Sequence, residues 1–285
     1  YNSRAVKKQQ PISEKETRHA AHLAWEEQRR AKADVRAAGA KALADMEKNG
    51  GSGIVLAGRP YHVDPEINHG IPELIAAYGL TVLTEDCLPI DFVPKRPVRV
   101  NDQWVYHSRL YTAAEFVCGR DDLELIQLNS FGCGLDAVTT DEVCELLEQG
   151  GKLYTCLKID EVNNLGAVRI RIRSLLAAVA MRRERGIHST SHVQPFERVY
   201  YTKEMQKQHY TILAPQMSPI HFDILEPIFR HHGYNFEVLQ NDDRAAIDAG
   251  LKYVNNDACY PSITAVGQLM EAVTSGRYDT DHLAL

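Results

Sequence analysis

The stretch GIVLAGRPYHVDPEINHGIPELIAAYGLTVLTED, residues 53–86, decides the fold class of this chain. It begins with the short apolar run GIVLAG, which is typical of a buried parallel strand, and continues with the polar loop RPYHVDPEINHG. The segment IPELIAAYGL then has the pattern of a helix, and TVLTED that of a second strand. A strand, a helix and another strand in this order predict a β-α-β unit with a parallel sheet.

The alternation of strands and helices continues to residue 185. Five further segments have the apolar patterns of two buried strands and three helices, which together with the first unit predict one α/β domain. In chain order, we expect a helix at residues 104–118, a strand at 122–129, a helix at 139–150, a strand at 152–159 and a helix at 165–185.

A polar stretch without periodicity, residues 186–198, separates this domain from a second, smaller α/β unit. Because the chain begins with Tyr1 and stops within a strand-like segment, we expect a piece of a longer polypeptide whose second unit is truncated. The strands of this unit are expected at residues 210–215, 235–240, 251–255 and 282–285, and its helices at 218–233, 242–250 and 260–276.

Residues 14–48 are rich in Ala, Glu, Lys and Arg and contain no Pro, which predicts a long helix. Unbroken, it would reach about 50 Å at 1.5 Å per residue, and we expect it to pack on a domain through Leu23 and Trp25. The predicted domains are a helical arm at 1–50, a first α/β domain at 51–192 with the Cys133 loop, and a second α/β domain at 193–285 with the Cys259 loop.

The composition excludes several classes of protein. The net charge is −6, with 32 basic and 38 acidic residues, so nothing suggests general attraction to nucleic acid or to anionic lipid. No apolar run approaches the roughly 18 residues of a membrane helix, and no signal peptide opens the chain. We therefore expect a soluble, cytoplasmic protein.

Two of the six cysteines occupy positions where a ligand is commonly bound. Cys133 lies between two glycines after the strand that ends near Asn129, at the carboxyl edge of the first sheet, where open α/β sheets bind ligands. Cys259 precedes Pro261 at a helix start, where the helix dipole favours the thiolate that binds soft metals. The two loops can meet across a cleft between the two units.

The other cysteines fit structural positions. The chain contains no C-x-x-C motif and is too poor in cysteine for a disulfide scaffold, so a metal site must combine residues far apart in sequence. Cys118 and Cys144 fall within helical patterns and Cys87 follows a strand, which favours buried, unreactive thiols. Cys156 lies in a strand of the core, near the sheet edge.

The first strand-to-helix loop concentrates polar residues at the same sheet edge as Cys133. Arg59 is a candidate for binding an anion, and Tyr61 and His62 are candidate proton donors, which makes these three the candidate catalytic residues. The alternative is a loop whose polar groups satisfy exposed backbone. Asp136 is a candidate for ordering the cysteine loop by accepting backbone N–H bonds.

Four segments resemble the large activator-type members of the 2-hydroxyacyl-CoA dehydratase family, and the likeness runs from about Ala24 to the end of the chain. In that family an ATP-binding activase region is joined to a dehydratase-like, iron–sulfur-binding region, and this chain resembles the latter. The segments are GIVLAGRPYHVDPEINHGI (53–71), LIQLNSFGCGLDAVTTDEV (125–143), LYTCLKIDEVNNLGAVRIRIRSLLAA (153–178) and YVNNDACYPSITAVGQL (253–269).

The resemblance implies two Rossmann- or flavodoxin-like parallel-sheet units after a helical N-terminal segment. It implies an iron–sulfur-binding electron-transfer module of an ATP-dependent 2-hydroxyacyl-CoA dehydratase activator or reductase, of the 2-hydroxyglutaryl-CoA dehydratase type, in anaerobic metabolism. The implied cofactor is an air-sensitive [4Fe-4S] or double-cubane cluster held by Cys133 and Cys259, with Cys156 as a further candidate. The implied partners are an ATP-dependent activase domain or subunit and an acyl-CoA or other small substrate.

The chain departs from the family pattern in two respects. It has no glycine-rich phosphate loop, so the ATPase site does not lie in this chain. It offers two well-placed cysteines where a cubane cluster usually needs three or four, so a further ligand must come from Cys156, Cys87, sequence beyond Leu285 or another subunit.

Two alternatives to the redox function stay open at this point. The first is a scaffold without metal, which would bind a CoA thioester, a nucleotide or the activase and in which the thiols would be incidental. Convergence of Cys133 and Cys259 on one place would favour the cluster, and wide separation the scaffold. The second, catalysis by a nucleophilic thiol, is weaker because no histidine is placed in sequence to pair with one.

Overall fold

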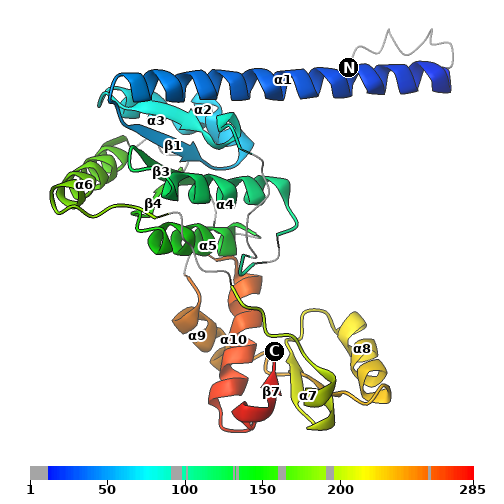
Figure 1. Ribbon diagram of the computed structural model, residues 1–285. Helices are drawn as coiled ribbons and strands as arrows, with labels where there is room; N and C mark the ends of the chain where they lie inside the picture. Colours follow the sequence, from blue (N-terminus) through cyan, green and yellow to red (C-terminus); the bar gives the residue numbers. More distant parts are fainter. Residues whose placement is uncertain are drawn as a thin grey trace.

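The computed structural model describes residues 12–90, 98–100, 102–130, 132, 135–159, 165–190, 196–255 and 258–285. Over these ranges the chain forms a long N-terminal helix followed by two parallel-sheet units, each with helices packed around its sheet (Figure 1). The predicted α/β class and the helical N-terminal segment are therefore confirmed.

The N-terminal helix α1 spans Glu14–Lys48 and begins at a capping box. The Ser13 Oγ accepts a hydrogen bond from the Glu16 backbone N–H, and the Glu16 carboxylate accepts one from the Ser13 backbone N–H, at 3.3 and 2.9 Å. The helix ends at Asn49, before Gly50, whose φ of +62° starts the turn into the first sheet.

Only the last turns of α1 pack against the first unit, and the rest of the helix extends past it (Figure 1). The side chains of Leu43 and Met46 are buried, and at Gly39 the helix approaches so closely that a Cβ would overlap the carbonyl of Cys87. The prediction that Leu23 and Trp25 pack on a domain is wrong, since they are 50% and 61% exposed. Their apolar character does not bury them, because they lie in the first half of α1, and only the last turns of the helix pack on the first unit.

The first sheet has four parallel strands in the order β2-β1-β3-β4. This is the order of flavodoxin-like doubly wound folds, in which ligands bind at the carboxyl ends of the strands where the winding reverses. Here that point lies between β1 and β3. The strands are β1 (Gly53–Ala57), β2 (Thr81–Thr84), β3 (Leu123–Asn129) and β4 (Thr155–Lys158).

Both faces of this sheet are covered by helices, as a parallel sheet requires. Alternate residues of β1 enter different cores: Val55 and Ala57 pack with one set of helices, Ile54 and Leu56 with the other. The first set is α4 (Val105–Cys118), α5 (Asp136–Gln149) and the end of α1, and the second is α3 (Ile71–Ala76) and α6 (Leu165–Glu184).

The stretch predicted as a polar loop after β1 contains two short helical turns, each opened by a proline at its first position. Asp64 separates them, and its carboxylate accepts a hydrogen bond from the Glu66 backbone N–H at 2.9 Å. The turns are η2 (Pro60–Val63) and α2 (Pro65–Asn68), and a third, η3 (Glu85–Cys87), follows β2.

The second sheet has three parallel strands in the order β6-β5-β7. Its two small cores lie on opposite faces, one containing Leu213 and Ala272 and the other Phe222 and Phe236. The elements are α7 (Lys203–Lys207), β5 (Thr211–Ala214), α8 (Pro219–His231), β6 (Asn235–Val238), α9 (Arg244–Tyr253), α10 (Tyr260–Thr274), η4 (Thr280–His282) and β7 (Leu283–Ala284).

The strand predicted at residues 251–255 does not exist. These residues are the last turn of α9 and its C-cap, in a helix that begins at the Asp243 N-cap. At Gly250 a Cβ would overlap the Ile263 carbonyl of α10, so glycine allows the two helices to pack closely. This helix pair overrides the local strand preference of Tyr253 and Val254.

Several contacts among the described residues join the units. The Arg198 guanidinium donates to the backbone carbonyls of Val98 and Val100 at 3.2 and 2.6 Å. Gly132, after β3, forms an isolated parallel β-bridge with Ala258, before α10. None of the helices in the described ranges combines the length and apolar composition that a membrane crossing requires.

Candidate functional site

A pair of opposite charges ties together two loops at the carboxyl edge of the first sheet. Arg59 follows β1, and Asp136 is the first residue of α5. The Arg59 Nε lies 3.2 and 3.1 Å from the two carboxylate oxygens of Asp136, and its Nη2 lies 3.0 Å from Oδ2. This forked geometry is the strong form of an arginine–carboxylate pair. The guanidinium predicted to bind an anion therefore already holds a carboxylate of this chain.

His62 is buried and both of its ring nitrogens are engaged. Its Nδ1 accepts from the Arg59 backbone N–H at 2.9 Å, so the proton resides on Nε2, which donates to the Ser130 Oγ at 2.9 Å. Burial lowers the pKa of His62 to about 4; Asp136 opposes this shift and Arg59 adds to it. The imidazole is neutral at pH 7 and links the loop after β1 to the loop after β3.

Tyr61 lies against this histidine with its ring edge-on. The ring centroids of Tyr61 and His62 are 4.4 Å apart at 65°, and Tyr61 is 43% exposed. Of the three candidate catalytic residues, Tyr61 is thus the most exposed; Arg59 is partly exposed but paired with Asp136, and His62 is buried. Their catalytic role stays a prediction.

His107 also belongs to this cluster, and sequence reasoning did not predict its place there. It projects from α4, with Nε2 3.3 Å from Asp136 Oδ1, and it is buried. Burial, followed by the charge of Arg59, lowers its pKa, and Asp136 acts in the opposite direction. The available signal was weak, because a histidine on the buried face of a helix looks like a core residue until its partner is known.

A cavity of about 180 Å³ lies at the same edge, between β3, β4, α5 and the loop before α10. Among the described residues, two cysteines line it: Cys156 of β4, half-buried, and Cys144 of α5. The remaining lining residues are Asn129, Gly132, Thr140, Asp141, Tyr154, Lys158, Arg171, Asn255 and Ala258.

The β-bridge between Gly132 and Ala258 forms part of the wall of this cavity. In sequence these residues immediately precede Cys133 and Cys259. Cys259 is the N-cap of α10, as predicted for a cysteine at a helix start, and its Sγ lies 3.1 Å from the Ser262 Oγ. Cys133 lies outside the described residues.

The remaining thiols differ in character. Cys87 and Cys118 belong to the hydrophobic core of the first unit, where the sequence placed unreactive thiols. Cys144, predicted to be equally inert, instead lines the cavity. Burial, with Glu148 beside it, raises the pKa of Cys144 to about 11, so this thiol is protonated at neutral pH.

A metal site formed entirely by the described residues is not present. Within the described ranges, no three His, Cys, Asp or Glu side chains come together as a metal ion would require. A complete ligand set at this edge would therefore need a residue outside those ranges, for which Cys133 is the candidate in this sequence, or a ligand from elsewhere.

Comparison with known proteins relates the first part of the chain to activases. Residues 2–88 match the family described as "CoA enzyme activase uncharacterised domain". The match covers α1, β1, β2 and the loop that carries Arg59 and His62. No curated protein and no solved structure matches the chain. This N-terminal region is thus related to CoA-enzyme activases, which confirms the family resemblance at that general level.

Proposed function

We propose that this chain is an iron–sulfur-binding electron-transfer module that acts with an ATP-dependent activase on a CoA-linked enzyme. The observation that carries the proposal is the Gly132–Ala258 bridge. It joins the two loops that carry Cys133 and Cys259, at the wall of a cavity that Cys156 also lines. The meeting of these two loops supports the cluster over a scaffold in which the thiols are incidental.

The donor set at this edge suits a cluster of iron and sulfide. Thiolates on separate loops are the ligands that such clusters use, and Cys133, Cys259 and Cys156 are the three we assign. Cys144 is not assigned as a ligand, because burial and the neighbouring Glu148 raise the pKa of its thiol and so disfavour the thiolate form that iron binds. A cluster bound here would accept one electron at low potential and pass it on.

The surrounding residues support such a site by fixing its walls and its charge. The Arg59–Asp136 pair and the His62–Ser130 hydrogen bond hold the loops after β1 and β3 together. Arg171 places its positive charge in the wall of the cavity, where it would partly neutralise the negative charge of thiolate ligands. The family match of residues 2–88 supports an activase or CoA-enzyme partner, and an acyl-CoA substrate is part of the same proposal.

Iron and acid-labile sulfide per chain, measured with the visible spectrum after anaerobic purification, test this function. Cys133→Ala and Cys259→Ala should each lose the iron, and Cys118→Ala, which removes a core thiol remote from the cavity, should retain it. Absence of iron from the unaltered chain after anaerobic reconstitution would refute the proposal, as would iron retained in both loop variants.

A further inference from the structure

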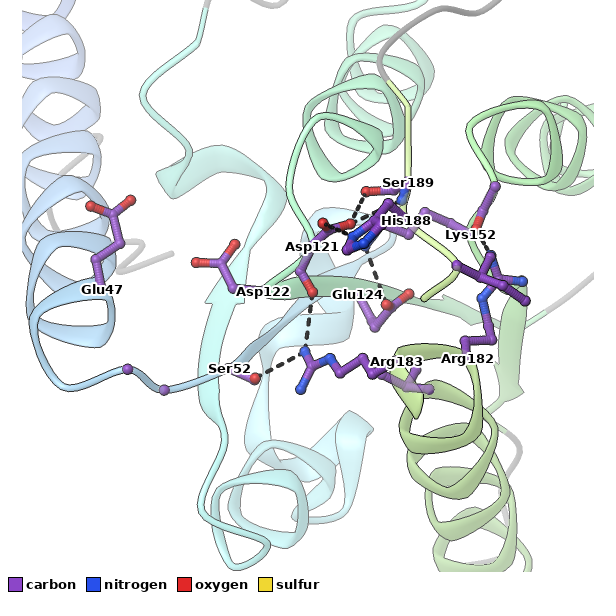
Figure 2. A pocket seen from close by; sticks show the side chains of 15 residues that line it. Glu47, Ser52, Asp121, Asp122, Glu124, Lys152, Arg182, Arg183, His188 and Ser189 are labelled. Atoms are coloured by element: carbon purple, nitrogen blue, oxygen red, sulfur yellow. Dashed lines mark hydrogen bonds and ion pairs between the residues drawn. The ribbon is translucent and has the colours of Figure 1, made fainter. Parts of the chain in front are cut away.

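A second, larger cavity opens at the opposite, amino edge of the first sheet (Figure 2). Its volume is about 520 Å³, within the range of small-molecule sites. The end of α1, the first residues of β3, the turn before β4 and the end of α6 surround it. Neither the cysteine loops nor the residues of the carboxyl edge contribute to this cavity.

Three of the four acidic side chains in the wall are already bound by the protein. Glu47 and Asp122 both pair with Arg120, at 2.7 and 2.6 Å. The Asp121 carboxylate accepts hydrogen bonds from the backbone N–H and hydroxyl of Ser189 at 2.9 and 2.7 Å, and His188 Nδ1 lies 2.9 Å from it. These groups hold the pKa of Asp121 well below its usual range.

Within the part of the chain that the structure describes, two arginines at the end of α6 hydrogen-bond only to uncharged groups, although both act electrostatically on Glu124. Arg182 donates to the Gly151 carbonyl, and Arg183 donates to the Ser52 Oγ and the Asp121 carbonyl, both at 3.1 Å. Figure 2 shows the two side chains extending from the helix end in these two directions. Among the described residues, no carboxylate forms an ion pair with either guanidinium. Each keeps further N–H donors for a ligand.

The fourth acid, Glu124, presents an acceptor that the protein leaves unused. Its Oε1 lies 3.2 Å from the Lys152 Nζ. The Lys152 ammonium also donates to the Arg120 and Leu123 carbonyls, both at 2.7 Å. Glu124 is only 9% exposed, and its Oε2 is buried and has no hydrogen-bond partner within the described part of the chain. A buried acceptor without a donor is costly.

We propose that this cavity binds a small phosphorylated polyol, whose phosphate pairs with Arg182 and Arg183 and whose hydroxyl donates to Glu124 Oε2. Arginine guanidiniums bind phosphate oxygens well, and among the described residues Arg182 and Arg183 have hydrogen bonds only to uncharged groups, which leaves their charge for a phosphate. A bare dianion would be repelled by Glu124, whereas a ligand that also carries an O–H satisfies it. The volume leaves room for both groups.

Calorimetric titration of the full chain with glycerol 3-phosphate and with n-propyl phosphate, which lacks the hydroxyls, tests both halves of the proposal. Glycerol 3-phosphate should bind the unaltered protein about tenfold more tightly than n-propyl phosphate, the usual effect of one hydrogen bond to a charged group. Equal affinities would overturn the assignment to Glu124.

The variant Arg182→Gln/Arg183→Gln should weaken binding of both probes at least tenfold. Its matched control is Arg173→Gln/Arg185→Gln, which removes the same charge from exposed positions of α6 and the residue after it, outside the cavity. Circular dichroism and melting without ligand establish that both variants fold. No binding to the unaltered chain, or equal weakening in both folded variants, would overturn the proposal. Neither result bears on iron binding at the opposite edge.

Discussion

Arg59 and Asp136, separated by 77 positions in sequence, form a forked ion pair across the carboxyl edge of the first sheet. His107 approaches the same carboxylate from α4 at 3.3 Å. The Asp136 side chain is only 14% exposed, so it connects three elements from a position largely shielded from water. Its first role is to fix the geometry of this edge, where Cys144 and Cys156 line a cavity.

We therefore predict that Asp136→Asn destabilises the protein. The substitution keeps the shape of the side chain but leaves the partly buried Arg59 without a counter-charge, which should lower the free energy of unfolding by about 2 kcal/mol. Urea denaturation measures this change. Glu66→Gln, an exposed carboxylate on the same loop, is the matched control and should alter stability by less than about 0.5 kcal/mol. A stability loss in the control as large as that in Asp136→Asn would contradict the assignment.

A pH dependence should arise from His62. In the folded protein this imidazole takes up a proton only near pH 4, whereas in the unfolded chain it does so near pH 6.5. Between these values the unfolded state binds more protons, so the contribution of His62 to stability declines as the pH falls from 6.5 to 4. The buried His107, whose pKa is also lowered, acts in the same direction.

The experiment compares urea denaturation at pH 7.5 and 4.5. His62→Asn keeps a side-chain acceptor for the Arg59 N–H and removes the titrating ring, so its loss of stability on acidification should be smaller by on the order of 2 kcal/mol. Exposed His231→Asn should respond to acid as the unaltered chain does. An unchanged pH dependence in His62→Asn would show that His62 is not kept neutral by burial.

The parts of this fold that sequence could predict are those in which local pattern and tertiary environment agree. The run at residues 53–58 is apolar because the sheet buries both faces of β1, so its pattern correctly indicates a buried strand. Residues 251–255 lack that agreement. Their β-branched and aromatic side chains favour a strand, but the Asp243 cap and the Gly250 contact with α10 make them the end of a helix.

The candidate site divides in the same way. The positions of Cys259 at a helix start and of Arg59 after a strand follow from local signals, and the structure confirms both placements. The bridge from Gly132 to Ala258 and the approach of His107 to Asp136 depend on tertiary packing, which no local pattern encodes. The amino-edge cavity could not be predicted from sequence, because basic residues such as Arg182 and Arg183 are common in the last turn of a helix, where they suit the helix dipole.

Exposed apolar residues on α1 make a third prediction. Trp25 is 61% exposed, whereas Leu43 is 4% exposed within the core of the first unit. Trp25→Gln should change the free energy of unfolding by less than about 0.5 kcal/mol, and Leu43→Ala should lower it by about 2–4 kcal/mol. Thermal and urea denaturation measure both. A large loss in Trp25→Gln would mean that the first half of α1 packs on the protein in solution.

The fourth prediction concerns Gly39, where two effects of opposite sign compete. Glycine within a helix is less favourable than alanine by about 1 kcal/mol, so propensity alone predicts that Gly39→Ala stabilises the protein. The Cβ of alanine, however, would overlap the carbonyl of Cys87, and backbone cannot move aside as a flexible side chain can. We expect overpacking to dominate, with a net loss of about 1–3 kcal/mol and faster proteolysis of α1 as its anchor loosens.

Urea denaturation and limited proteolysis of Gly39→Ala measure the two consequences together. Its control is Ala40→Gly at the adjacent, exposed position, where only helix propensity operates and the loss should be about 1 kcal/mol without release of the helix. If Gly39→Ala proved more stable than the unaltered chain, the close approach of α1 to Cys87 would be wrong. The anchoring of the helix would then rest on contacts such as the buried Leu43 and Met46 and the Glu47–Arg120 pair.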